Sequence, residues 1–131
     1  VIGRVLSSTS SRLSLEMTRR SDRPTPFGDL DGDRPMLTQP FTLEAIFQGA
    51  GLLSMALDGW SCLPVGVASA WICHAQPTEA SPLTIHVLRT GIEEHDVIHD
   101  AIAVDSASRV VYAAEGVRLR HFTELPNRLA L

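Results

Sequence analysis

A chain of 131 residues is long enough for one domain with a single hydrophobic core and shorter than two domains usually require. Apolar residues form 44% and charged residues 20% of the sequence, values that argue against a disordered or fibrous chain. The net charge of −4 gives no general attraction to nucleic acid or to anionic membranes.

The sequence also bears on where the protein resides. No apolar run reaches the roughly 18 to 20 residues needed to span a bilayer, and no signal-peptide pattern opens the chain. We therefore expect a soluble, cytoplasmic protein. Cys62 and Cys73 lack the spacing of a zinc site or of a disulfide framework, so both are expected to be buried thiols. Because Val1 is not an initiator methionine and the first residues already resemble a strand, we expect residues 1–131 to be one domain of a longer protein.

The predicted elements begin with a β-hairpin. Residues 1–6 and 12–17 alternate apolar and polar side chains on either side of a serine-rich turn, a pattern typical of half-buried strands. Residues 18–40 are rich in Arg, Asp, Gly and Pro and contain several X-Pro pairs, which disfavour extended helix or strand. We predict a long functional loop there.

Charged residues in this loop allow two interpretations. Every basic residue of the chain is arginine, which we attribute to codon bias. The alternative is a small phosphate-binding rim, because guanidinium groups pair well with phosphate oxygens. Its members would be Arg19, Arg20, Arg23 and Arg34. Asp29, Asp31 and Asp33 resemble a fragment of a calcium loop, but the downstream glutamate spacing is wrong, so we predict no metal site.

Residues 41–58 form the one convincing helix. Apolar side chains recur at about 100° per residue and occupy one arc, which we expect to pack against a sheet. The arc comprises Leu43, Ile46, Phe47, Ala50, Leu53, Ser54 and Leu57. Thr38 is placed to cap the helix start, Pro40 fits the first turn, and Gly59 stands where a helix commonly ends.

Four strand-like runs follow the helix, at residues 63–74, 83–90, 96–104 and 109–122. The segments 79–82, 91–94 and 105–108 have the composition of turns between neighbouring antiparallel strands. A hairpin, one long helix and a four-stranded meander together make an α+β domain.

A second stripe of the helix carries polar side chains. Glu44 and Gln48 lie about 40° apart on the helical wheel, and Gly51 and Met55 complete the stripe, apart from the apolar arc. A carboxylate one turn from the helix start is consistent with stabilisation by the helix dipole alone. Its pairing with an amide four residues later calls for a further explanation.

Several motifs resemble known dehydratases. The helix resembles that of bacterial 3-hydroxyacyl carrier-protein dehydratases over residues 43–53, LEAIFQGAGLL, because in that family a catalytic Glu is followed by Ala and, four residues on, by Gln. Residues 34–36, RPM, lie where the family has an Arg-Pro-Val-like segment. Two later segments look more like the C-terminal half of type I polyketide synthase dehydratase domains: 63–67, LPVGV, and 114–120, AEGVRLR.

The resemblance implies a hot-dog fold, in which an antiparallel sheet wraps around one long central helix. It implies elimination of water from a 3-hydroxyacyl thioester to give a trans-2-enoyl product: a histidine removes the α-proton and Glu44 protonates the departing hydroxyl. Polyketide enzymes usually carry Asp at this position. Gln48 would orient Glu44 through a hydrogen bond. The substrate is expected to lie in an apolar tunnel beside Pro40, Phe41, Phe47, Gly51, Leu63, Pro64 and Val65.

The resemblance also implies partners. The substrate would arrive on the phosphopantetheine of an acyl carrier protein, and no bound cofactor is expected. Other synthase domains are expected partners. A second hot-dog domain, as a homodimer or as a fused half, is expected because one such layer leaves apolar surface and unpaired strand groups exposed.

The histidine of the family is replaced by Leu30. In type I polyketide dehydratases two hot-dog domains are fused, the first supplying the histidine and the second the acid, so we prefer the interpretation that this chain is the second half. The histidines that are present are expected to be solvated or hydrogen-bonded; they are His74, His86, His95, His99 and His121. Two alternatives stay open: a hot-dog thioesterase in which Glu44 activates water, and a degenerate hot-dog domain kept for dimerisation or carrier docking.

Overall fold

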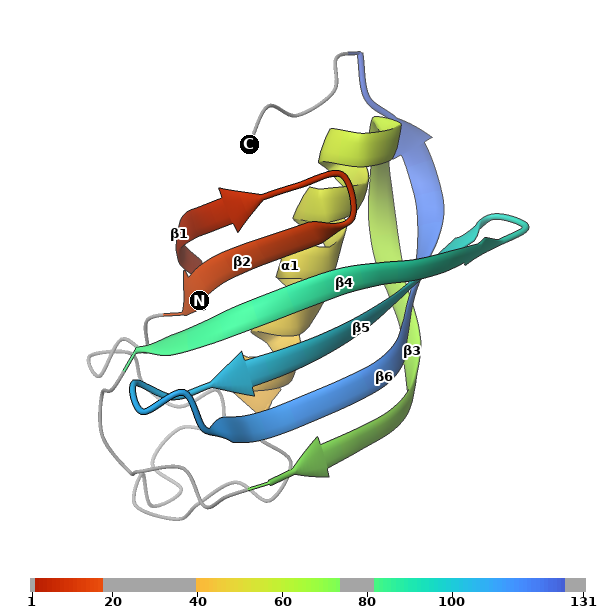
Figure 1. Ribbon diagram of the computed structural model, residues 1–131. Helices are drawn as coiled ribbons and strands as arrows, with labels where there is room; N and C mark the ends of the chain where they lie inside the picture. The colour runs from red at the N-terminus through yellow and green to blue at the C-terminus, as the bar shows by residue number, and fades with distance from the viewer. Residues whose placement is uncertain (1, 18–39, 74–81, 127–131) are drawn as a thin grey trace, which may run out of the picture.

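The computed structural model describes residues 2–17, 40–73 and 82–126. Its elements are β1 (Ile2–Ser8), β2 (Arg12–Met17), α1 (Pro40–Asp58), β3 (Trp60–Ile72), β4 (Leu83–Glu93), β5 (Asp96–Val104) and β6 (Val110–Glu124). The six strands form one antiparallel sheet that curves around α1, and the helix contacts every strand (Figure 1). The predicted α+β architecture with one long central helix is therefore confirmed.

The strand order differs from the predicted meander. It is β1-β2-β4-β5-β6-β3, so β4, β5 and β6 are consecutive neighbours, whereas β3 pairs with β6 rather than with β4. The reason is that the N-terminal hairpin takes the place beside β4, through pairs such as Leu15 with Ile85. As a result β3, which directly follows the helix, is an edge strand.

Alternation along the strands produces the core. Inward-facing residues of β2 pair directly with those of β4, for example Leu13 with Val87, and all of them are buried. On the helix the predicted apolar arc supplies the other half of the core, with Ile46 and Leu53 fully buried and Phe47 packed against them in part. Burial of one such large side chain stabilises the fold by about 1.5 to 3 kcal/mol.

The helix ends where the sequence predicted. Gly59 has a φ of 75°, and its N–H donates to the carbonyl of Met55 at 3.2 Å. A left-handed residue directly after a helix favours glycine, because a side chain there is strained. Pro40 is the first helical residue, also as predicted, and Thr38 lies outside the described residues.

β3 starts earlier and β4 ends later than the local pattern predicted. β3 begins at Trp60, which pairs with Glu124 of β6. β4 continues to Glu93, which pairs with Asp96, so that the predicted turn at 91–94 shrinks to residues 94 and 95. Pairing with a neighbouring strand extends both elements beyond the point where alternation stops.

Two residues differ from the expected burial. His99 on β5 is fully buried rather than solvated, and the backbone of Val117 is the polar group that its ring contacts. Burial, together with the charge of Arg89, lowers the pKa of His99 to about 4. Cys73 is exposed instead of buried, because it directly follows Ile72, the last residue of the edge strand β3. His86 points outward as predicted and shares a hydrogen bond of 2.8 Å with Ser14.

Candidate active site

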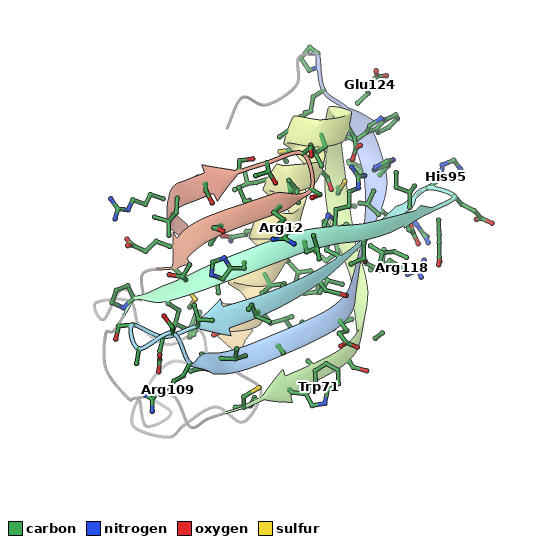
Figure 2. All side chains as sticks on the ribbon, viewed as in Figure 1. Arg12, Trp71, His95, Arg109, Arg118 and Glu124 are labelled. Atoms are coloured by element: carbon green, nitrogen blue, oxygen red, sulfur yellow. The ribbon has the colours of Figure 1, made fainter. Side chains whose placement is uncertain are left out.

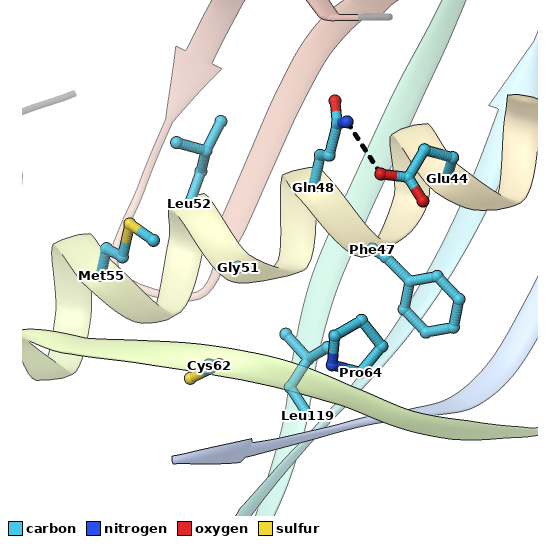
Figure 3. Close-up of a pocket in the computed structure, with 9 residues that line it drawn as sticks. All are labelled: Glu44, Phe47, Gln48, Gly51, Leu52, Met55, Cys62, Pro64 and Leu119. Carbon is cyan, nitrogen blue, oxygen red and sulfur yellow. Dashed lines mark hydrogen bonds between the residues drawn. The ribbon is translucent and has the colours of Figure 1, made fainter. Parts of the chain in front are cut away.

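A pocket of about 410 Å³ lies between α1 and the strands β3 and β6. Its helical lining includes the whole predicted stripe, from Glu44 and Gln48 to Gly51 and Met55 (Figure 3). The complete lining is Glu44, Phe47, Gln48, Gly51, Leu52, Met55, Cys62, Pro64 and Leu119. The stripe therefore faces a groove, while the apolar arc beside it faces the core, except that Phe47 also lines the groove.

A hydrogen bond fixes the carboxyl group at one end of this groove. Gln48 Nε2 donates to Glu44 Oε1 at 2.9 Å, which is the predicted i to i+4 contact (Figure 3). Glu44 is exposed and Gln48 half-buried. The amide engages Oε1, and within residues 2–17, 40–73 and 82–126 no hydrogen bond to the other carboxyl oxygen is seen. The contact is present, and the catalytic role of Glu44 stays a prediction.

The middle of the groove is apolar. Phe47 and Leu52 line it from the helix, Pro64 from β3, and the buried side chain of Leu119 from β6. Pro64 and Leu119 are direct partners in the β3–β6 ladder, so their side chains point to the same face of the sheet. This lining suits a hydrocarbon chain better than a polar ligand.

A thiol lies at the other end of the groove. Cys62 is half-buried, and its Sγ donates a weak hydrogen bond to the carbonyl of Trp60 at 3.7 Å. Burial is the largest cause that raises the pKa of Cys62, and the charge of Asp58 adds to it, whereas the side chain of Ser54 and the charge of Arg89 act in the opposite direction. The thiol is therefore neutral near pH 7 and is a poor nucleophile.

An ion pair stands next to this thiol at the end of the helix. Arg89 donates through both Nη atoms to the two Oδ atoms of Asp58, at 2.8 and 2.6 Å. The ring of His121 stacks on Trp60 with centroids 5.2 Å apart, and its Nε2 lies 3.9 Å from Asp58 Oδ2. None of these side chains lines the groove. The charges of Asp58 and Arg89 act on Cys62, so the ion pair lies behind the part of the wall that Cys62 forms.

Only some of the residues predicted to bind the substrate line the groove. Phe47, Gly51 and Pro64 line the groove. Phe41 packs partly against the core, and Pro40 is the first residue of the helix.

Leu63 and Val65 do not line the groove, and they are 51% and 49% exposed. Successive strand residues point to opposite faces, so Leu63 turns away when Cys62 and Pro64 face the helix, and the ladder is irregular between Pro64 and Gly66.

The sequence pattern did not predict three of the lining residues, Leu52, Cys62 and Leu119. Leu119 could have been found only from the pairing of β6 with β3, which local alternation does not reveal.

Some predicted features lie outside the described residues. They are Leu30, His74, the aspartates at 29, 31 and 33, and the four arginines of the 18–40 segment. Within the described ranges, no three His, Cys, Asp or Glu side chains come together as a metal site. No helix in the same ranges is long and apolar enough to cross a bilayer.

The sequence matches the family described as polyketide synthase dehydratase N-terminal domain over residues 7–128, nearly the whole chain. The chain belongs to this family. The resemblance to polyketide dehydratases is therefore confirmed. The family description names the N-terminal domain, however, whereas the motifs at 63–67 and 114–120 resemble the C-terminal half, so the preference for the second half stays a prediction.

Solved structures share the fold of this dehydratase domain. A hypothetical thioesterase with coenzyme A from Streptococcus pneumoniae superposes with a TM-score of 0.71 at 12% identity, covering 93% of this chain and 87% of that one. S. sahachiroi AziG has a TM-score of 0.65 at 16% identity, covering 91% and 90%. The E. coli PaaI protein has a TM-score of 0.64 at 10% identity, covering 93% and 80%. These superpositions establish the hot-dog fold, and at such low identities they show no activity. No curated protein matches the sequence.

Proposed function

We propose that this chain supplies the acid in a dehydratase that removes water from a 3-hydroxyacyl thioester and forms a trans-2-enoyl product. The observation that carries the proposal is the Glu44 carboxyl group, held by Gln48 at 2.9 Å at one end of an apolar groove. Membership of the dehydratase family supports the reaction type. The groove supports a substrate with a hydrocarbon chain.

The proposed step needs one base and one acid. A base removes a proton from C2, the electron pair of that C–H bond forms the C2–C3 double bond, and the C3–O bond breaks. The departing hydroxyl takes the proton of Glu44 and leaves as water. Gln48 binds Oε1, so the proton transferred is the one on the second carboxyl oxygen. Glu44 regains a proton before the next turnover, and no electron acceptor or bound cofactor is required.

The base comes from outside the described lining. Among the described residues that form the groove, none is a histidine, and the family histidine position is Leu30. Cys62 is the other titratable group of the lining, and its raised pKa makes it a poor base near pH 7. A second hot-dog domain is the source that we propose, with this chain as one domain of a longer synthase or as one half of a dimer.

The edge strand β3 offers a place for that second domain. It exposes four large apolar side chains, Leu63, Val65, Trp71 and Ile72, and Trp71 stands out on this edge in Figure 2. An exposed apolar edge strand pairs readily with another strand. β3 also forms one wall of the groove, so a domain docked there would bring its own residues close to Glu44 and exclude water. The substrate would then be delivered on the phosphopantetheine of an acyl carrier protein.

A thioesterase is the second candidate. Glu44 is exposed, so water reaches its carboxyl group, and an ionised carboxylate could activate that water against a thioester carbonyl. This reaction uses the same groove and the same residue. The two functions differ in their products and in whether the substrate needs a 3-hydroxyl.

A pair of substrates separates the two functions. The full-length protein is incubated with a 3-hydroxyacyl pantetheine and, separately, with the saturated acyl pantetheine of equal length. The proposal predicts a conjugated enoyl thioester from the first substrate and no free thiol from either. Release of free pantetheine from both substrates would show a thioesterase instead. If neither substrate reacts, the remaining interpretation is a degenerate hot-dog domain without catalytic activity.

A further inference from the structure

The groove has a direction, from polar to apolar. Glu44 and Gln48 stand at one end, and Met55 and Cys62 stand at the other (Figure 3). Glu44 and Met55 are separated by three turns of helix, about 16 Å at 1.5 Å per residue. Every lining residue between the two ends is apolar or is Gly51. An acyl chain that begins at the carboxyl group therefore finds an apolar surface along the helix toward the thiol.

Gly51 keeps the middle of the groove open. A Cβ placed on Gly51 would meet no atom within 4 Å among the described residues, so packing inside the domain does not require glycine there. Gly49, two residues earlier, is different: its Cβ would lie 2.8 Å from a methyl group of Leu15 and 3.1 Å from one of Val87. Glycine inside a helix costs about 1 kcal/mol relative to alanine. Contact with the sheet accounts for a glycine at position 49. At position 51 we attribute the glycine to the groove, which a side chain there would narrow.

The far end of the groove is firmly supported. Cys62 is half-buried beside the Asp58–Arg89 ion pair, which is held by two hydrogen bonds of 2.8 and 2.6 Å. Breaking a largely buried ion pair is costly, so this wall does not yield readily to a longer ligand. Met55 completes the end from the helix.

We propose that this groove selects acyl chains by length: the chain leaves the reacting carbons at Glu44, passes over Gly51 and ends against Met55 and Cys62. Gly51, Met55 and Cys62 are then specificity-determining residues. The inference deepens the proposed function and rests on it for the position of the reacting carbons. It concerns binding, so it is testable without turnover.

The two cysteines of the chain provide the test, because Cys62 lies in the groove and Cys73 is exposed outside it. The full-length protein is alkylated with iodoacetamide, and modification of each thiol is followed by peptide mass spectrometry. The ligands are S-butyl and S-dodecyl pantetheine, thioethers that are neither dehydrated nor hydrolysed. Each is used at about ten times its dissociation constant, set by calorimetry, where occupancy predicts about tenfold slower reaction of a covered thiol.

The expected result depends on chain length. S-dodecyl pantetheine slows alkylation of Cys62 about tenfold and leaves Cys73 unchanged, whereas S-butyl pantetheine protects neither thiol. Gly51→Leu abolishes the protection. The matched control is Gly91→Leu, because Gly91 on β4 also has no atom near its Cβ position among the described residues and lies outside the groove. This variant keeps the protection.

Three results would overturn the proposal: equal protection by both ligands, no protection of Cys62 by bound S-dodecyl pantetheine, or full protection in Gly51→Leu. Should Cys62 react too slowly to follow, calorimetry decides, because affinity should rise by up to about fourfold per buried methylene in the wild type and much less in Gly51→Leu. Length-dependent binding without water elimination would retain the groove and reject the dehydratase. Water elimination without length-dependent binding would retain the dehydratase and reject selection by chain length in the groove.

Discussion

Glu44 combines an exposed position with a fixed orientation. Its carboxyl group is held by Gln48 at 2.9 Å, while the groove beyond it is apolar. The sequence predicted this pair because an i to i+4 contact is local helix geometry. It could not predict the exposure of Glu44, which depends on what lies across the groove. An exposed acid competes with water for the substrate hydroxyl, so the proposed mechanism requires a cover over this site.

His99 is the residue whose environment was predicted least well. It stands between Ile98 and the charged Asp100 in the sequence, and its strand position turns it into the core, where it is fully buried. Alternation in β5 places His99 on the same face as Val97 and on the opposite side from Ile98, and only the sheet shows which face is inside.

Burial of His99 predicts a pH-dependent stability. Its pKa falls from 6.5 to about 4 in the folded protein, so the unfolded chain binds the proton more readily. Stability is therefore full above about pH 6.5 and decreases as the pH falls toward 4, by at most about 3 kcal/mol. Urea unfolding across this range should show the decrease in the wild type and a smaller one in His99→Leu. The exposed His86 is the control, and His86→Gln should behave like the wild type; an equally steep decrease in His99→Leu would refute the assignment.

At the scale of elements, α1 serves two purposes on two faces. Its apolar arc forms the core with β2 and β4, and its polar stripe forms the groove with β3 and β6. Both faces could be predicted from helical periodicity alone. The identity of the facing strands could not, because it follows from long-range pairing.

Substitution of two glycines tests whether α1 has one face in the core and one face on the groove. Gly51→Ala should stabilise the domain by about 1 kcal/mol, because the helix gains alanine and the new methyl group meets open space. Gly49→Ala gains the same propensity but pushes against Leu15 and Val87, so it should destabilise the domain by about 1 to 2 kcal/mol. Thermal unfolding of the two variants provides the comparison. Equal stabilisation by both substitutions would show that Gly49 is not packed against the sheet.

For the whole molecule, the strand order determines where the site opens. Placing the hairpin beside β4 leaves β3 at the sheet edge, next to the groove. The sequence predicted the elements and the fold class, because periodicity and family motifs are local. It did not predict that β3 pairs with β6, since that pairing joins residues about sixty positions apart, such as Cys62 and His121.

The edge strand predicts how the domain associates. Val65→Lys places a charge among the exposed apolar residues of β3 and should weaken association with a second hot-dog domain by about 2 kcal/mol or more. The matched control is Ile92→Lys, at the end of β4, where a 60% exposed isoleucine lies away from this edge. Sedimentation equilibrium measures both. Identical association of wild type and Val65→Lys would place the interface elsewhere.

The most direct test concerns the proton given to the leaving hydroxyl. The rate of enoyl thioester formation from a 3-hydroxyacyl pantetheine is measured for the full-length protein, for Glu44→Gln and for Glu115→Gln, whose exposed carboxyl group on β6 lies outside the groove. If Glu44 is the acid, the rate in Glu44→Gln should be about 10² to 10⁴ times lower, with its melting temperature unchanged and Glu115→Gln fully active. A Glu44→Gln protein that forms the enoyl product at the wild-type rate would contradict this role.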